Sequence, residues 1–189
     1  MSKSPATDRA SNPTSAQLIE LFSQIESGRV TKEKLQSFIR GRDQDAASGY
    51  TVPVNYDLTV EQLVRDGLYD WADDNTTSAP FPLGKKGKEF ATIELVTIDR
   101  LLTTEAVLDL IADRGLYRPN IKEGLSLGIW YPDLQRESQI AILYEPWRLP
   151  VSHPRVPCLR GNASSRYLGL LWFAGVWDPD WRFAAVRRA

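Results

Sequence analysis

The order of the predicted elements indicates an α+β fold with a largely antiparallel sheet. Helical patterns dominate the first two thirds of the chain, and four predicted strands then follow one another to the C-terminus. Strands gathered in one part of a chain favour an antiparallel sheet over the alternating order of a doubly wound parallel sheet. The 189 residues, of which 42% are hydrophobic and 25% charged, suffice for one globular domain with a small appendage.

The N-terminal quarter divides into three predicted parts. Residues 1–14 are polar with almost nothing to bury, and we expect a disordered tail there. Apolar residues then recur at helical spacing on both sides of Gly28, which predicts a helical hairpin over residues 15–41. Residues 41–49 are polar and resemble a linker, so we expect the hairpin to be an appendage separable from an α+β domain over residues 50–189.

Local signals predict the elements of this domain. Pro53 cannot donate a backbone hydrogen bond, so its strand belongs at a sheet edge. Thr59 and Gln62 have the spacing of a capping box, which predicts a helix ending at Gly67. Alternating residues make 89–98 the clearest strand. In chain order, the predicted elements are strand 52–55, helix 59–67, strand 89–98, helices 104–113 and 119–131, and strands 139–144, 155–159, 166–175 and 181–187.

Aromatic residues crowd the C-terminal end of the chain. Three of the six tryptophans, Trp172, Trp177 and Trp181, fall within this segment. The last two strands, joined by a turn at residues 176–180, predict a closing, Trp-rich β-hairpin. The rings of this hairpin are either core or recognition surface.

Side-chain alternation divides the rings near residue 170 between two faces. Trp172 shares a face with Leu168 and Leu170, which is typical of a core position. Phe173 lies on the other face beside Gly169, where the small neighbour leaves room for a ligand or another segment. We therefore expect Trp172 to be buried and Phe173 to be the more dispensable ring for folding.

These features predict a non-enzymatic ligand- or protein-binding module with a C-terminal Trp-rich β surface. Trp177 and Trp181 flank the expected turn, where rings are difficult to bury completely. The predicted binding residues are Tyr167, Phe173, Trp177, Asp178, Asp180, Trp181 and Arg182.

Charge is unevenly distributed, which leaves a second function open. From Arg148 to the C-terminus, seven arginines and two acidic residues give a net charge of +5, in a chain whose total is −1. Arginine suits carboxylates, phosphates and aromatic faces. These arginines either decorate the sheet and pair with the acidic part of the chain, or form a nucleic-acid-binding surface.

A carboxylate-based enzyme is the third possibility. Asp70, Asp73 and Glu137 are candidate catalytic acids, provided that they meet in one cleft. Asp133 and Glu145 carry further carboxylates without a catalytic motif. The oxygen-rich loop 70–75, with Asp70, Asp73, Asp74 and Asn75, does not have the spacing of a calcium-binding loop.

Residue counts exclude several other chemistries. With a single histidine, His153, and a single cysteine, Cys158, the chain lacks the ligands of a structural zinc site and cannot form an internal disulfide. The two residues could form a catalytic dyad only across a tight turn. We predict no catalytic residues, no metal and no cofactor.

No membrane partner is expected. The longest uncharged apolar run, from Tyr167 to Trp177, is far shorter than a bilayer span. The N-terminus lacks the apolar stretch of a signal peptide. Since a lone cysteine suits a reducing compartment, we expect a cytoplasmic protein.

The chain shows two resemblances, and the second of them implies a binding function. Over about residues 50–189 the chain resembles an uncharacterised family of short bacterial proteins, through VNYD at 54–57, YDW at 69–71, YRP at 117–119, YPDLQR at 131–136 and WRFAAVR at 181–187. The order of Arg118-Pro119, the Trp-rich segment and the strand 183–187 is also similar to C-type-lectin-like domains of the formylglycine-generating-enzyme kind. The catalytic cysteines of the sulfatase-modifying enzymes are absent here. Some bacterial and phage members of that superfamily are diversified ligand-binding proteins, so this resemblance implies a binding module.

Overall fold

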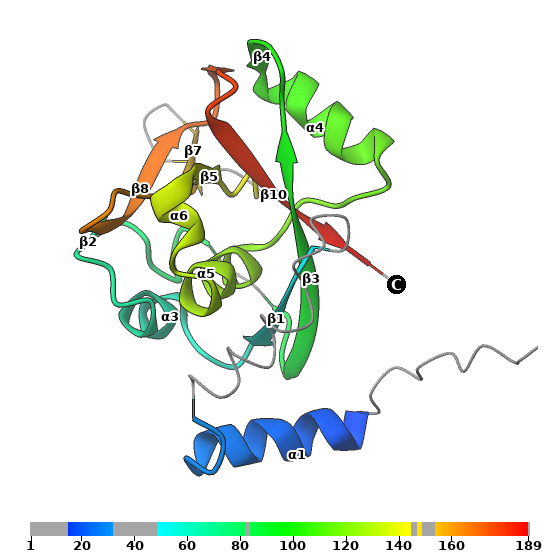
Figure 1. The fold of residues 1–189 in the computed structure, drawn as a ribbon, viewed down its shortest axis with the longest axis vertical. Helices are drawn as coiled ribbons and strands as arrows, with labels where there is room; N and C mark the ends of the chain where they lie inside the picture. The colour runs from blue at the N-terminus through cyan, green and yellow to red at the C-terminus, as the bar shows by residue number, and fades with distance from the viewer. Residues whose placement is uncertain (1–14, 32–48, 82–83, 145–146, 149–153, 189) are drawn as a thin grey trace, which may run out of the picture.

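The centre of the protein is an eight-stranded mixed β-sheet, seen here in a computed structural model that describes residues 15–31, 49–81, 84–144, 147–148 and 154–188. The strand order is β1-β3-β10-β5-β7-β8-β2, with β6 beside β7, and β4 and β9 form a separate pair (Figure 1). The strands are β1 (Tyr50–Asn55), β2 (Trp71–Ala72), β3 (Lys88–Thr97), β4 (Leu102–Thr103), β5 (Gln139–Ala141), β6 (Trp147–Arg148), β7 (Pro154–Gly161), β8 (Arg166–Trp172), β9 (Val176–Trp177) and β10 (Trp181–Arg187).

The predicted α+β class with a largely antiparallel sheet is confirmed. The pairs β10–β5 and β2–β8 are parallel, and the other strand pairs of the sheet are antiparallel. The described helices are α1 (Ser15–Glu26), α3 (Val60–Asp66), α4 (Thr104–Asp113), α5 (Ile121–Trp130) and α6 (Leu134–Glu137). None of them combines the length and the apolarity that crossing a bilayer requires.

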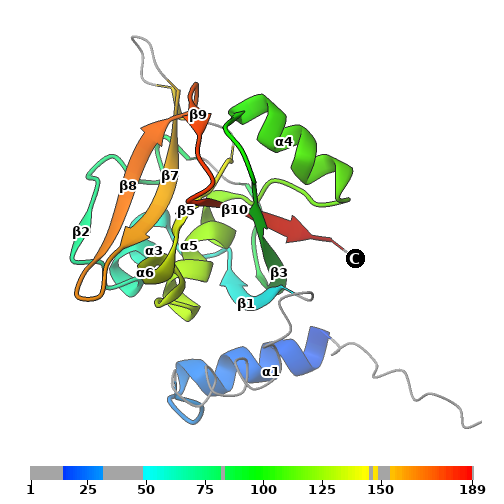
Figure 2. The same cartoon turned by 45° about the horizontal axis from the view of Figure 1, so that its top comes forward.

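Each face of the sheet has its own hydrophobic core. The α5 core joins α3 and α5 to one face, and the α4 core joins α4 to the other (Figures 1 and 2). Strand β3 serves both cores because its side chains alternate, with Ile93 in the α5 core and Val96 in the α4 core. The residues between β2 and β3 add Phe81 to the α5 core.

Local capping explains where the helices begin. Thr59 and Gln62 form the predicted capping box of α3, in which the Gln62 amide nitrogen donates to the Thr59 hydroxyl at 3.2 Å. Asn120 and Glu123 form a second capping box at the start of α5. Pro119 therefore lies just before the capping residue and two positions before Ile121, the first helical residue, whereas the sequence predicted a helix that begins at residue 119.

Helix α1 lies against the ends of β1 and β3 (Figures 1 and 2). Phe22 is buried, with its ring centroid 6.0 Å from that of Phe90, and Glu26 pairs with Lys88. The predicted tail at 1–14, the second helix of the expected hairpin and most of the linker lie outside the described residues. Whether residues 15–41 are separable stays a prediction.

The last two long strands differ from the expected closing hairpin. Strands β8 and β10 belong to one sheet, but β7 and β5 lie between them. Strand β8 pairs with β7, whereas β10 pairs with β3 and β5. The hairpin prediction is wrong in this respect because Phe183, Ala184 and Ala185 are buried from both sides, which suits a central strand better than the second strand of a terminal hairpin.

Glu61 ties the chain after β2 to helix α3, and this contact predicts a pH effect. Its carboxylate accepts hydrogen bonds from the Ser78 amide at 2.8 Å and the Ser78 hydroxyl at 2.7 Å, which lowers the pKa of Glu61 to about 2. A carboxyl whose folded pKa lies below its unfolded pKa stabilises the fold above the unfolded value, and this contribution disappears as the pH falls through the folded value.

We therefore expect Glu61→Gln to remove part of the acid sensitivity of the protein. Urea denaturation should show a loss of about 1 kcal/mol at pH 7, a modest value because the group is partly solvated. The loss should shrink between pH 5 and 2, since wild-type Glu61 itself becomes protonated there. Asp74→Asn, at an exposed acid of the neighbouring loop, is the control. A Glu61→Gln deficit that is equal at pH 7 and pH 2 would contradict this origin.

Candidate ligand-binding site

A row of four polar and aromatic side chains crosses four neighbouring strands. Trp71 of β2 pairs with Tyr167 of β8, and Tyr167 pairs with Arg160 of β7. The register of β5 against β7 places Gln139 next to Arg160. Because paired residues of adjacent strands project from the same face, these four side chains stand side by side. This row, the Trp71–Gln139 row, lies on the face that carries the α4 core, beyond the part that α4 covers.

The row borders a shallow hollow of about 470 Å³. The hollow is lined by Trp71, Gln139, Arg160, Gly161, Asn162, Tyr167 and Gly169. Gly169 has no side chain to fill the hollow. A Cβ atom built at this position would lie 3.2 Å from the sulfur of Cys158. Burial raises the pKa of the Cys158 thiol to about 12, so the thiol stays protonated and is not a nucleophile.

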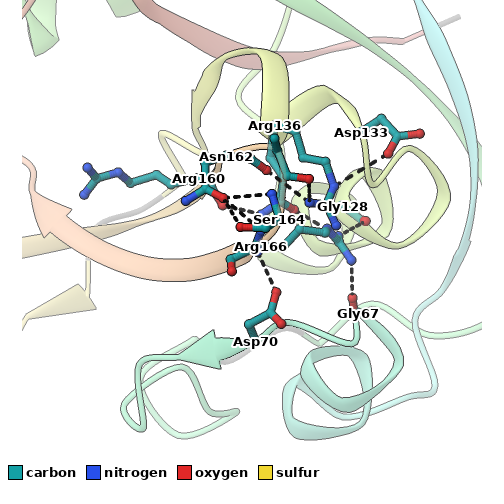
Figure 3. A network of polar contacts seen from close by, with 12 residues as sticks. Gly67, Asp70, Gly128, Asp133, Arg136, Arg160, Asn162, Ser164 and Arg166 are labelled. Atoms are coloured by element: carbon teal, nitrogen blue, oxygen red, sulfur yellow. Dashed lines mark hydrogen bonds and ion pairs between the residues drawn. The ribbon is translucent and has the colours of Figure 1, made fainter.

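The row presents groups that a ligand can reach. Trp71 is 53% exposed, and Arg160 is exposed as well. The Arg160 guanidinium forms no hydrogen bond or ion pair with another described residue, and in Figure 3 it points away from the polar network behind the strand. Both an aromatic face and a charged donor are therefore available.

A second hollow of about 220 Å³ adjoins the first and shares Gln139 and Gly161 with it. It is lined by Gln135, Arg136, Glu137, Ser138, Gln139, Gly161, Asp180 and Arg182. The Arg182 guanidinium donates to the Pro179 carbonyl at 2.8 Å, which holds this side chain near the turn before β10. Because they share these two residues, the two hollows meet at the start of β5 and the end of β7.

A buried arginine fixes the strands behind the row. Arg166 donates to the Gly67 carbonyl at 2.6 Å, to the Gly128 carbonyl and to the Gln135 side-chain oxygen at 2.9 Å (Figure 3). Its guanidinium lies over the Tyr69 ring, 4.9 Å from the centroid. These contacts join α3, α5, α6 and β8, so the row rests on a rigid support.

Two residues of α6 hold the β7–β8 turn. Gln135 donates to the Arg160 carbonyl at 2.6 Å, and Arg136 donates to the carbonyls of Asn162 and Ala163, both at 3.0 Å. Asn162 in turn accepts from the Ser164 amide at 2.9 Å, which closes the turn internally. The backbone that carries the row is thus ordered before any ligand arrives, and preorganisation of this kind lowers the cost of binding.

The acidic residues of the predicted loop stabilise the sheet edge. Asp70 accepts a hydrogen bond from the Arg166 amide at 2.7 Å, and Asp73 accepts from the Asn75 amide at 3.0 Å. Among the described residues, no three potential ligands gather in a group that could hold a metal ion. Glu137 lines the second hollow without Asp70 or Asp73, so these three acids do not share a cleft. Glu145 and His153 lie outside the described residues.

Three of the predicted binding residues lie at this surface. Tyr167 lines the first hollow, and Asp180 and Arg182 line the second. Asp178 is exposed at the nearby turn, where its side chain accepts from the Asp180 amide at 2.9 Å. Phe173 is half-buried and packs against the α4 core, with the Arg118 guanidinium 6.0 Å from its ring centroid.

Two predicted binding residues are core residues instead. Trp177 and Trp181 are only 5% and 9% exposed, and their ring centroids lie 5.0 Å apart in an edge-to-face arrangement. The Trp177 indole donates to the Thr104 hydroxyl at 2.8 Å. The expectation that these rings resist burial is wrong because β9 pairs with β4 and the start of α4 meets the indole, contacts that the turn sequence does not reveal.

Trp172 was expected to be buried, and the structure shows it exposed. It is 50% exposed, and the Arg155 guanidinium lies 4.4 Å from its ring centroid. It does share a face with Leu168 and Leu170, which contact the α5 core. Trp172 ends strand β8, however, and lies beyond the helices that cover this face. Alternation assigned the correct face but could not show where the core stops.

The most accessible residues of the row were not predicted as binding residues. Trp71 lies in the oxygen-rich loop 70–75, for which the sequence predicts no strand, and Arg160 is one of the seven arginines from Arg148 onward. Their grouping depends on β2 and β7 flanking β8, a pairing between segments far apart in the chain. No local pattern in the sequence reports that pairing.

Comparison of the chain with protein-family models, with curated proteins and with solved structures found no match. The similarities to a bacterial family and to C-type-lectin-like domains therefore stay predictions.

Proposed function

We propose that this protein is a non-enzymatic binding module that takes its ligand on the Trp71–Gln139 row. The observation that carries the proposal is the alignment of an exposed indole, a phenol, an arginine that pairs with no other described residue, and a side-chain amide across four adjacent strands. None of these four side chains belongs to either hydrophobic core of the described residues.

The chemistry of the row indicates the kind of ligand. Trp71 and Tyr167 offer flat apolar surfaces for stacking, and Arg160 offers a fork of donors for a carboxylate or phosphate. Gln139 adds an amide that both donates and accepts. The row thus favours a ligand that combines a planar or ring-shaped group with a negative charge, and binding such a ligand requires no reactive residue.

Two other features agree with this proposal. The resemblance to diversified C-type-lectin-like proteins also implies a binding module, although that resemblance places the surface in the Trp-rich segment itself. Cys158 is buried and unpaired, which suits the cytoplasmic location that we propose.

A ligand panel with two variants tests the proposal. Nucleotides and oligonucleotides, acidic and aromatic peptides, and oligosaccharides are each titrated into the isotope-labelled full chain and followed by NMR chemical-shift changes. We expect one class to bind and to shift residues of the row. Trp71→Ala and Arg160→Ala should each weaken that binding about tenfold, because exposed aromatic and arginine anchors dominate binding energy. Both should change the free energy of unfolding by less than about 0.5 kcal/mol.

Trp172 and Arg155 provide a matched control. They are also a partly exposed tryptophan with a neighbouring arginine, but they lie on the opposite face of the sheet. Trp172→Ala should leave ligand affinity unchanged. If no ligand class depends on Trp71 and Arg160, or if Trp172→Ala weakens binding as much, the row is not the binding site.

A further inference from the structure

We infer that the ligand of the row is single-stranded nucleic acid, an inference that rests on the proposed function and names its ligand class. Three features carry it: the neighbouring positions of the two rings, the arginines of the two hollows, and the Gln139 amide that both hollows share.

The two rings occupy neighbouring positions of the sheet, on which unpaired bases can stack. Trp71 and Tyr167 occupy paired positions on β2 and β8, and adjacent strands lie about 4.8 Å apart. Single-strand-binding surfaces use such neighbouring aromatic side chains as platforms, since every base has a face that can stack. A base inside a duplex is covered on both sides by its neighbours, so stacking on these rings requires a single strand.

Arginines lie beside the rings and in the second hollow. Arg160 stands next to Tyr167, and Arg136 and Arg182 line the adjoining hollow. The Nη1 atoms of Arg136 and Arg182 already donate to backbone carbonyls, so a phosphate would bind through the other terminal nitrogen of each. Guanidinium groups bind phosphates through paired hydrogen bonds. Glu137 and Asp180 lie in the same lining and offset part of this charge, so only a few phosphate contacts are expected. For about three contacts on a single strand, the logarithm of affinity should fall with the logarithm of salt concentration with a slope of about −2.

Amide side chains lie between the rings and the second hollow. Gln139 is shared by both hollows, and Asn162 lines the first one. The Asn162 side-chain oxygen is occupied by the turn, where it accepts from the Ser164 and Ser165 amides at 2.9 Å each. Gln139 is therefore the amide that faces the ligand, and one amide supports at most a weak base preference. We expect binding of RNA and DNA strands with little sequence selectivity.

Fluorescence anisotropy with the full chain tests this inference. The probes are fluorescein-labelled oligouridylate and oligothymidylate of about 12 nucleotides, a length within the range of known single-strand sites, and a duplex of the same length. We expect both single strands to bind, the duplex to bind at least tenfold more weakly, and the salt slope to be about −2.

Variants connect this binding to individual residues. Trp71→Ala should reduce affinity about tenfold, whereas Trp71→Phe should retain most of it because a ring remains. Arg160→Ala should reduce affinity and also make the salt slope shallower by about 0.7, the share of one phosphate contact. Trp172→Ala should change neither. Melting temperatures of all variants show whether any loss reflects unfolding.

The outcomes separate this inference from the proposed function. Absence of oligonucleotide binding, or binding that is indifferent to Trp71→Ala and Arg160→Ala, overturns the nucleic-acid inference. If the same variants then lose affinity for a peptide or an oligosaccharide of the panel, the binding function stands with another ligand. If no ligand class depends on Trp71, both conclusions fail. Equal affinity for duplex and single strand would also overturn the inference, since it would show backbone contacts without stacking.

Discussion

Arg166→Ala should lower the free energy of unfolding by about 3 to 5 kcal/mol, the range for removing a buried charged group that its partners need. Arg166 is buried, and its guanidinium supplies donors to the Gly67 and Gly128 carbonyls and to Gln135. Alanine would leave these acceptors without their donors and create a cavity beside Tyr69. Urea or guanidinium denaturation followed by circular dichroism measures the loss.

Two neighbouring substitutions sharpen this test. Arg166→Lys keeps the charge, but one ammonium group cannot reproduce the forked geometry, so its loss should be intermediate. Arg160→Ala, at an exposed arginine on the adjacent strand, should cost less than about 0.5 kcal/mol. A loss below about 1 kcal/mol for Arg166→Ala would mean that water or other side chains satisfy the two carbonyls.

Trp177→Ala should destabilise the protein far more than Trp172→Ala. Trp177 packs edge-to-face against Trp181 and Phe183, with ring centroids 5.0 Å and 5.5 Å away. Its removal opens a cavity in the α4 core and leaves the Thr104 hydroxyl without the indole donor, for an expected loss of about 3 to 5 kcal/mol. Trp172→Ala removes a half-exposed ring at a strand end and should cost less than about 1 kcal/mol.

Thermal denaturation of the two variants checks this order. Phe173→Ala should fall between them, because its ring is half-buried against the α4 core. Equal losses for Trp172→Ala and Trp177→Ala would show that Trp172 covers apolar surface at the end of β8. A larger loss for Trp172→Ala would restore the assignment that strand alternation alone suggests.

Elements defined by neighbouring residues could be predicted from the sequence. The Thr59–Gln62 capping box marks the start of α3, and Pro53 lies on an edge strand as predicted. The helix predicted over 104–113 is α4, and the strand predicted over 89–98 is β3 within one residue at each end. These predictions succeeded because capping, proline chemistry and side-chain alternation act between residues only a few positions apart.

Part of the candidate site also follows from the sequence. Tyr167, Asp180 and Arg182 were expected at a C-terminal surface, and all three line the two hollows. Composition pointed to this region because aromatic residues and arginines concentrate there. It could not distinguish a ring that a ligand can reach from a ring that packs in a core, since both are aromatic residues in a strand or turn.

The sequence by itself thus determined the fold class, most element positions and the region that carries the site. Only the tertiary structure decided which strands are neighbours, and therefore that Trp71 joins Tyr167, Arg160 and Gln139 in one row. It also decided the burial of the rings, because α4 and the β4–β9 pair cover Trp177, whereas Trp172 at the end of β8 is 50% exposed. The physical reason is the same in each case. Strand pairing and side-chain burial depend on contacts between segments that are distant in the chain. Local sequence patterns report only on interactions between residues a few positions apart, so they do not reveal these contacts.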